Sequence, residues 1–298
     1  MYKKMAVLLD GSELAEVVFR YALELAGRMG VELELVHVCR PQESEQLPMR
    51  RAYIEHMAEI LCAKAEEVRK KYGREELSEC VRTHGTVLVG DPAEEILEYV
   101  EQHDVDLVMM STHGSSGLKR WNLGSVANKV IHATRVPVWL VPVELREDII
   151  SDTLPGRNLV VPLSADDNSK VAIPHAVNVI KQRGAEAESE LVLLNVVEPP
   201  LVTVSLEALE MFDKRRSDMK EFLEETAKPL RESGLTVRTE VLVGDPAESI
   251  INYLRDHPAQ LLVMATRART GLSRLVFDSV TEHVLQLVKK TPLLLVGE

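Results

Sequence analysis

Residues 87–94 read VLVGDPAE, and residues 241–248 read VLVGDPAE again, 154 positions further along the chain. Self-similarity at a fixed spacing is the sequence signature of a duplicated structural unit. The same spacing matches further pairs on both sides of the octapeptide: Ile96 with Ile250, Tyr99 with Tyr253, His103 with His257 and Met110 with Met264.

The repeat predicts two copies of one domain. Of the 298 residues, we assign 1–143 to the first copy and 158–298 to a degenerate second copy. Residues 144–157 (ELREDIISDTLPGR) are charged, contain a Pro-Gly pair and read as a linker. Two domains of this size also agree with the length of the chain.

Composition excludes several classes of protein. The formal net charge is −12, from 35 basic and 47 acidic residues, so the surface repels phosphate backbones and we expect no nucleic-acid partner. No uncharged apolar stretch reaches 18 residues, so we expect no membrane span. Cys39, Cys62 and Cys80 form no CxxC pair, and an odd number of cysteines indicates reduced thiols in a cytoplasmic protein without a zinc site.

The first copy alternates strands and helices. Apolar or alternating runs predict strands, and apolar residues at helical spacing predict helices. The expected strands are residues 5–9, 31–38, 80–89, 105–110 and 136–143; the expected helices are residues 13–29, 50–72, one beginning after Asp91, and 125–134. Such alternation predicts an α/β fold, here two tandem doubly wound, Rossmann-like domains, each with a five-stranded parallel sheet.

Local signals mark the expected helix ends. Ser12 is expected to cap the first helix and Gly30 to end it. Asp91 precedes Pro92, which is typical of a cap followed by the first helical position. In the second copy, we expect Pro229 to interrupt the helix over residues 205–232.

The carboxyl ends of the first and fourth strands are the expected binding site, because ligands of open parallel sheets bind where the strand order reverses. Residues 111–126 read STHGSSGLKRWNLGSV and lead into a helix. Glycines let backbone N–H groups face an anion, and the helix start adds positive potential. Across the crevice, Asp10 could hold a ribose, an adenine amine or a magnesium ion.

These motifs together resemble the universal stress protein family, and the whole chain is similar to two such proteins in tandem. The resemblance rests on the strand-Asp-Gly-Ser opening, the LVHV strand, VGDPAEEIL and HGSSGLKRWNLGSV. Nucleotide-binding members carry G-x2-G-x9-G-[S/T]. Here Ser111 stands at the first glycine position, and Gly114, Gly124 and Ser125 match the others.

The resemblance implies an ATP or AMP site, with or without Mg²⁺, and no protein-held metal. It places Leu8, Leu9, Asp10, the Val38 backbone and Met110 around the adenosine, Ser111 at the ribose or phosphates, and His113, Gly114, Gly124, Ser125, Val126 and Ala127 at the phosphates.

The second copy departs from this pattern. Asp10 becomes Ser164, Gly114 becomes Ala268 and Gly124 becomes Asp278. A carboxylate at a helix start caps the free N–H groups itself and repels phosphate. We therefore expect the first copy to bind nucleotide and the second not to bind it in the same way.

The sequence leaves three functions to compare. The first is a stress-response regulatory protein that binds an adenine nucleotide and has no catalytic residues. The second is a ligand-free scaffold with an unidentified protein partner. The third is an enzyme: an adenylating or dinucleotide-dependent enzyme, or a slow ATPase. However, the GxxxxGK[ST] loop is missing and the first turn, LLDGSELAE, lacks GxGxxG.

The last strand of each copy is apolar, over residues 136–143 and 291–296. Apolar sheet edges pair with other strands. We expect the copies to meet through these strands about a pseudo-twofold axis, as an intrachain pseudo-dimer, and further homodimerisation stays open.

Overall fold

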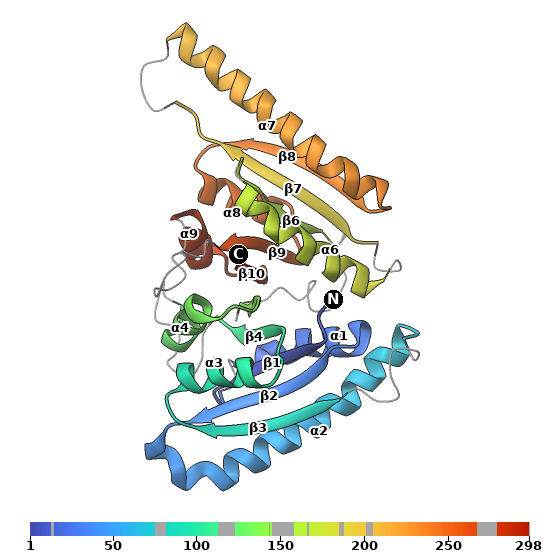
Figure 1. The fold of residues 1–298 in the computed structure, drawn as a ribbon, viewed down its shortest axis with the longest axis vertical. Coiled ribbons are helices and arrows are strands. Elements are labelled where there is room, and N and C mark those ends of the chain that lie inside the picture. The colour runs from blue at the N-terminus through green and yellow to red at the C-terminus, as the bar shows by residue number, and fades with distance from the viewer. Residues whose placement is uncertain are drawn as a thin grey trace.

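The computed structural model describes residues 1–12, 15–74, 82–112, 123–142, 144, 158–165, 167–184, 188–200, 205–266 and 279–297. Within these ranges the chain runs twice through the same order of strands and helices (Figure 1). No helix among the described residues is both long and apolar enough to span a membrane.

The first repeat follows the expected alternation. Its elements are β1 (Lys4–Leu9), η1 (Ala15–Val17), α1 (Val18–Met29), β2 (Glu32–Cys39), η2 (Pro41–Gln46), α2 (Leu47–Lys71), β3 (Thr83–Val89), α3 (Pro92–Gln102), β4 (Leu107–Ser111), α4 (Ser125–Ala133) and β5 (Val138–Val141).

The second repeat has the same order. Its elements are β6 (Leu159–Pro162), η4 (Asp167–Val171), α6 (Ala172–Arg183), β7 (Glu190–Val197), α7 (Leu206–Glu232), β8 (Thr236–Val243), α8 (Pro246–Asp256), β9 (Leu261–Thr266), α9 (Ser279–Leu287) and β10 (Leu293–Gly297).

Two expected helix signals are confirmed. Gly30 ends α1 in a left-handed conformation with φ 71°; its N–H donates to the Ala26 carbonyl, and the N–H of Val31 donates to the Leu25 carbonyl. The Asp91 side chain accepts hydrogen bonds from the N–H groups of Ala93 and Glu94 at the start of α3. Both residues satisfy backbone groups that a helix end leaves without partners.

Two others are wrong. Ser12 is not the N-cap residue of α1, because the α-helix begins only at Val18, after a 3-10 turn, and its N-cap residue is Val17; the N–H and hydroxyl of Ser12 donate to Oδ1 of Asp10. Pro229 does not interrupt α7, which runs on to Glu232. Pro229 lies in the last turn, three residues before the end of the helix, and its missing N–H leaves only the carbonyl of Glu225, an exposed residue, without its helical partner.

The two repeats share one ten-stranded sheet, in the order β3-β2-β1-β4-β5-β10-β9-β6-β7-β8. All neighbours are parallel except β5 and β10, which pair antiparallel with Leu294 opposite Trp139. This palindromic order confirms that the repeats meet through their last strands. The expected five-stranded sheets are therefore two halves of one sheet, whose long axis carries α2 and α7 at opposite ends (Figure 1).

Helices cover both faces of the sheet. On β1, Met5, Val7 and Leu9 point to a core layer with α1, α2, α6 and α7. Ala6 and Leu8 point to the opposite layer, with α3, α4, α8 and α9. Near-continuous apolar strands are typical of parallel sheets buried on both faces. The polar backbone ends of the strands are left for ligand sites.

Candidate functional site

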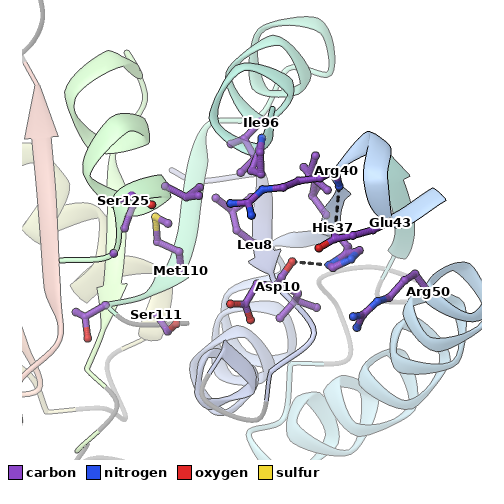
Figure 2. Close-up of a pocket in the computed structure, with 18 residues that line it drawn as sticks. Leu8, Asp10, His37, Arg40, Glu43, Arg50, Ile96, Met110, Ser111 and Ser125 are labelled. Atoms are coloured by element: carbon purple, nitrogen blue, oxygen red, sulfur yellow. Dashed lines mark hydrogen bonds between the residues drawn. The ribbon is translucent and has the colours of Figure 1, made fainter. Parts of the chain in front are cut away.

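A pocket of about 340 Å³ lies at the carboxyl ends of β1, β2 and β4 in the first repeat (Figure 2). β1 pairs with β2 on one side and with β4 on the other. The chain therefore reverses its direction of travel across the sheet between β1 and β4. Such a switch point is where open α/β sheets bind ligands.

Ten of the twelve predicted site residues line this one pocket. They are Leu8, Leu9, Asp10, Val38, Met110, Ser111, Gly124, Ser125, Val126 and Ala127. The other two, His113 and Gly114, lie outside the described residues, as do Lys119, Arg120 and Trp121 of the same loop.

The floor of the pocket is apolar. Leu8 of β1 and Met110 of β4 are each 6% exposed and pack in the same core layer as Ile96 of α3. Figure 2 shows these three side chains around the middle of the pocket. An apolar surface between strand ends suits the face of an aromatic ring.

One wall of the pocket is the N-terminus of α4. Gly124 is the N-cap residue and offers no side chain to the first N–H groups of the helix, which therefore carry positive potential toward the pocket. Gly124 has an ordinary φ of −55°, and a Cβ there would meet only the Thr112 carbonyl oxygen, at 3.9 Å. Gly124 is thus not needed for the backbone conformation, and its role is to leave this wall without a side chain.

Asp10 lies on the opposite side of the pocket, at the turn after β1. Its Oδ1 accepts hydrogen bonds from the Ser12 N–H at 3.0 Å and from the Ser12 hydroxyl at 2.6 Å. Gly11 follows with φ 79°, a backbone conformation that favours glycine. The carboxylate therefore holds the turn and borders the pocket at the same time.

His37 joins β2 to the end of β1. Its Nδ1 lies 2.8 Å from the Leu9 carbonyl oxygen, which can only accept, so Nδ1 donates. Burial lowers the pKa of His37 below its usual value, and the nearby positive charge of Arg50 adds to this. The neutral ring therefore fixes the strand ends beneath the pocket.

Sequence reasoning missed three charged residues that line the pocket: Arg40, Glu43 and Arg50. Arg40 directly follows β2, so the rule that ligands lie at strand carboxyl ends could have pointed to it. Glu43 in η2 and Arg50 in α2 have no such signal, because only the path of the chain after β2 brings them to the pocket.

A group of possible metal ligands lies elsewhere, at the amino ends of β2 and β3. One ligand atom each from Glu32, Glu34 and His84 lie within 4.8 Å of one another. Glu34, however, already accepts a hydrogen bond from the Tyr99 hydroxyl at 3.0 Å and lies 3.7 Å from Nζ of Lys4. Its carboxylate is thus engaged by the protein, and the group is far along the strands from the pocket.

The second repeat keeps the scaffold around the corresponding position but not the side chains. Asn195 takes the place of His37, and its Nδ2 donates to the Leu163 carbonyl at 2.7 Å. Ser164 stands where the first repeat has Asp10. Ala268 and Asp278 lie outside the described residues, so the expected self-capping by Asp278 stays a prediction.

Comparisons with known proteins agree with the duplicated fold. The family model described as "Universal stress protein family" matches residues 1–142 and again residues 156–297. A universal stress protein of Methanocaldococcus jannaschii is 33% identical over 141 residues, which are 47% of this chain and 82% of the relative. A universal stress protein of Bacillus subtilis is 30% identical over 149 residues, with 47% of this chain and 99% of the relative covered.

A solved structure matches the chain over both repeats. The crystal structure of a universal stress protein from Archaeoglobus fulgidus matches 99% of this chain and 98% of its own, with a TM-score of 0.68 and 18% identity, which shows the fold alone. A universal stress protein has also been solved in complex with cAMP; it covers 48% of this chain, with a TM-score of 0.32 and 19% identity. Since the family model covers both repeats, the chain belongs to the universal stress protein family, with two family domains in tandem.

Proposed function

We propose that the first repeat binds an adenine nucleotide, ATP or AMP, and that the protein is a stress-response regulator rather than an enzyme. The observation that carries the proposal is the convergence of ten predicted residues on one pocket at the switch point of the sheet. One member of the family is known in complex with cAMP, which supports a nucleotide ligand.

The chemistry of the pocket suits such a ligand. The apolar floor of Leu8 and Met110 would bury an adenine face, and the N–H groups of Ser125 and Val126 at the start of α4 would receive phosphate oxygens. Asp10 at the far side would accept hydrogen bonds from ribose hydroxyls. A magnesium ion would neutralise phosphate charge and would need ligands from the nucleotide itself.

The titratable pocket residues support a role without catalysis. Asp10 accepts from Ser12, His37 donates to the Leu9 carbonyl, and Glu43 accepts from the Arg40 N–H. Each of these side chains holds a turn or strand end, whereas a general base needs reach to a reacting proton. We propose the cytoplasm as the place of action, since Cys39 is a buried free thiol.

The test is calorimetry with ATP, AMP and adenosine on the full chain, with mass spectrometry of any retained nucleotide. A ligand at 100 times its dissociation constant should raise stability by about 2.7 kcal/mol. Absence of both binding and a thermal shift at millimolar ATP would instead support the ligand-free scaffold. Steady phosphate release under the same conditions would support an ATPase.

A variant of the α4 N-terminus makes this test specific. Gly124→Asp places in the first repeat the carboxylate that the second repeat carries as Asp278, and the site has room for it. Like charges a few ångströms apart cost about 1–4 kcal/mol, so ATP affinity should fall at least about fivefold. Ser205→Asp is the matched control, because it changes the net charge equally at the N-cap of α7.

A further inference from the structure

Arg40 places a guanidinium group inside the pocket of the first repeat. The residue directly follows β2 and lines the pocket. Figure 2 shows its side chain extending from the end of β2, between Ile96 and Leu8, toward the side on which Ser125 opens α4. The guanidinium and the helix N-terminus thus bring positive charge to the same space from opposite sides.

The backbone of Arg40 is held in place by two reciprocal hydrogen bonds. Its N–H donates to Oε2 of Glu43 at 3.1 Å, and its carbonyl accepts from the Glu43 N–H at 2.8 Å. Pro41 follows and restricts Arg40 to its extended conformation, with φ −71° and ψ 152°. The direction in which the side chain leaves the backbone is therefore fixed before any ligand arrives.

Among the residues that the structure describes, no carboxylate forms an ion pair with the Arg40 guanidinium. Oε2 of Glu43 accepts from the backbone N–H of Arg40. Arg183 and Arg238 in the second repeat, by contrast, each pair with glutamates. A guanidinium that lines a pocket without an internal partner suits an anionic ligand.

The second repeat shows which charge occupies the position equivalent to Arg40 in the other copy of the domain. β2 and β7 are each eight residues long, and their last residues, Cys39 and Val197, pair with Val89 and Val243 of the matching octapeptides. The residue after each strand is therefore equivalent, and Arg40 corresponds to Glu198. Gly124 corresponds to Asp278 by the 154-residue spacing of the sequence, so the second repeat has an acidic residue at both positions where the first favours an anion.

We propose that Arg40 is a specificity-determining residue that binds the phosphate groups of the nucleotide, so that affinity in the first repeat rises with the number of phosphate charges. The inference rests on the nucleotide site proposed above and goes beyond it, because it predicts that Arg40 recognises the phosphate groups of the ligand. The chain has no P-loop lysine, and Arg40 supplies the side-chain cation from the end of β2 instead.

A contact with the base is the competing role, because guanidinium groups also stack on aromatic rings. The two roles differ in their dependence on the ligand. If Arg40 contacts the phosphates, its removal weakens the binding of ATP and AMP but not of adenosine, and salt weakens the contact. If Arg40 contacts the base, its removal weakens the binding of ATP, AMP and adenosine equally.

The experiment measures the affinity of the full chain for ATP, AMP and adenosine by calorimetry, with Mg²⁺ and without it, at low and high salt. Arg40→Met keeps the length of the side chain and removes its charge, and Arg40→Glu copies Glu198. For Arg40→Met we expect ATP affinity to fall about 10- to 100-fold, adenosine affinity to change less than about twofold, and the salt dependence of ATP binding to weaken. Arg40→Glu should lose more ATP affinity than Arg40→Met.

Arg51→Glu is the matched control, since Arg51 is exposed on α2 and does not line the pocket. Its affinities should stay within about twofold of wild type. Equal loss of ATP and adenosine binding in Arg40→Met, or no loss at all, would overturn the assignment of Arg40 while the nucleotide site stands. If the wild-type chain binds none of the three ligands, the proposed function fails, and the role of Arg40 fails with it.

Discussion

At the scale of single residues, the two repeats use different side chains to donate a hydrogen bond to the carbonyl at the end of their first strand. The carbonyl at the end of the first strand, Leu9 or Leu163, needs a donor from the second strand. His37 provides it through Nδ1 and Asn195 through Nδ2. Both side chains are buried, but only the histidine can take up a proton.

This difference predicts how stability depends on pH. Since the pKa of His37 is lowered in the folded protein, the unfolded chain binds more protons as pH falls below about 6.5. The contribution of His37 to stability is therefore full above that pH and is lost as pH falls toward the lowered pKa. Arg50 strengthens the effect, whereas Asp10 and Glu43 oppose it.

We expect His37→Asn to keep the donor to Leu9, to cost less than about 1.5 kcal/mol at pH 7.5, and to reduce the loss of stability between pH 7 and 5. Urea unfolding at several pH values measures this. Some pH dependence should remain, because burial also lowers the pKa of His175. An unchanged pH profile would show that His37 does not titrate in this range.

At the scale of elements, the pocket depends on how closely α2 packs on its neighbours. A Cβ at Gly27 of α1 would lie 2.5 Å from the Ala65 carbonyl oxygen and 2.7 Å from Cβ of Val68, both in α2. A Cβ at Gly85 of β3 would lie 2.8 Å from Cγ2 of Ile54, also in α2. Glycines at these crossings let α2 lie against both α1 and β3, which brings Arg50 to the pocket.

Gly27→Ala tests this packing, because the close contact and helix propensity predict opposite changes in the free energy of unfolding. Helix propensity alone predicts that alanine stabilises α1 by about 1 kcal/mol. Because the Ala65 carbonyl belongs to a helix backbone and cannot move away alone, we expect destabilisation of about 1–3 kcal/mol instead. Chemical denaturation measures the difference, and a more stable variant would show that the helices are free to separate.

At the scale of the whole molecule, the seam between repeats combines strand pairing with a buried polar cluster. Arg183 of α6 donates to Glu24 of α1 at 2.6 and 3.0 Å and also bonds to Gln260. Its own carbonyl accepts from Nε of Arg28, which is 1% exposed. Tyr2 exchanges two hydrogen bonds with the Gln182 side chain. These contacts lock the direction in which the halves meet.

Arg183→Met should destabilise the protein by about 1–3 kcal/mol, since it removes the hydrogen bonds to Glu24 and Gln260, while Glu24 keeps Arg28 at 3.5 Å as a second cation. Arg255→Met is the matched control, because Arg255 pairs with Asp256 on the exposed surface, where a pair contributes about 0–1 kcal/mol. Thermal and urea unfolding of both variants give the comparison. Equal effects would mean that the cluster does not stabilise the seam.

Much of the fold was readable because its signals are local or repeated. The octapeptide established the duplication, and strand-helix alternation established the parallel sheet. Asp91 and Gly30 marked helix ends through hydrogen bonds within a few residues. The apolar last strands predicted the β5–β10 seam, since a buried strand needs a partner on each side. Ser12 and Pro229 were misread because competing contacts, with Asp10 and with solvent, decided their roles.

The amino-acid sequence by itself determined the two repeats, the order of their elements and the strand ends where a ligand would lie, because these follow from hydrophobic period and chain direction. Only the tertiary structure decided which charges meet there. Arg40 lies at a strand end, but Glu43 and Arg50 reach the pocket because η2 turns the chain and α2 packs closely on its neighbours. Such convergence depends on packing between elements, which no local pattern of residues encodes.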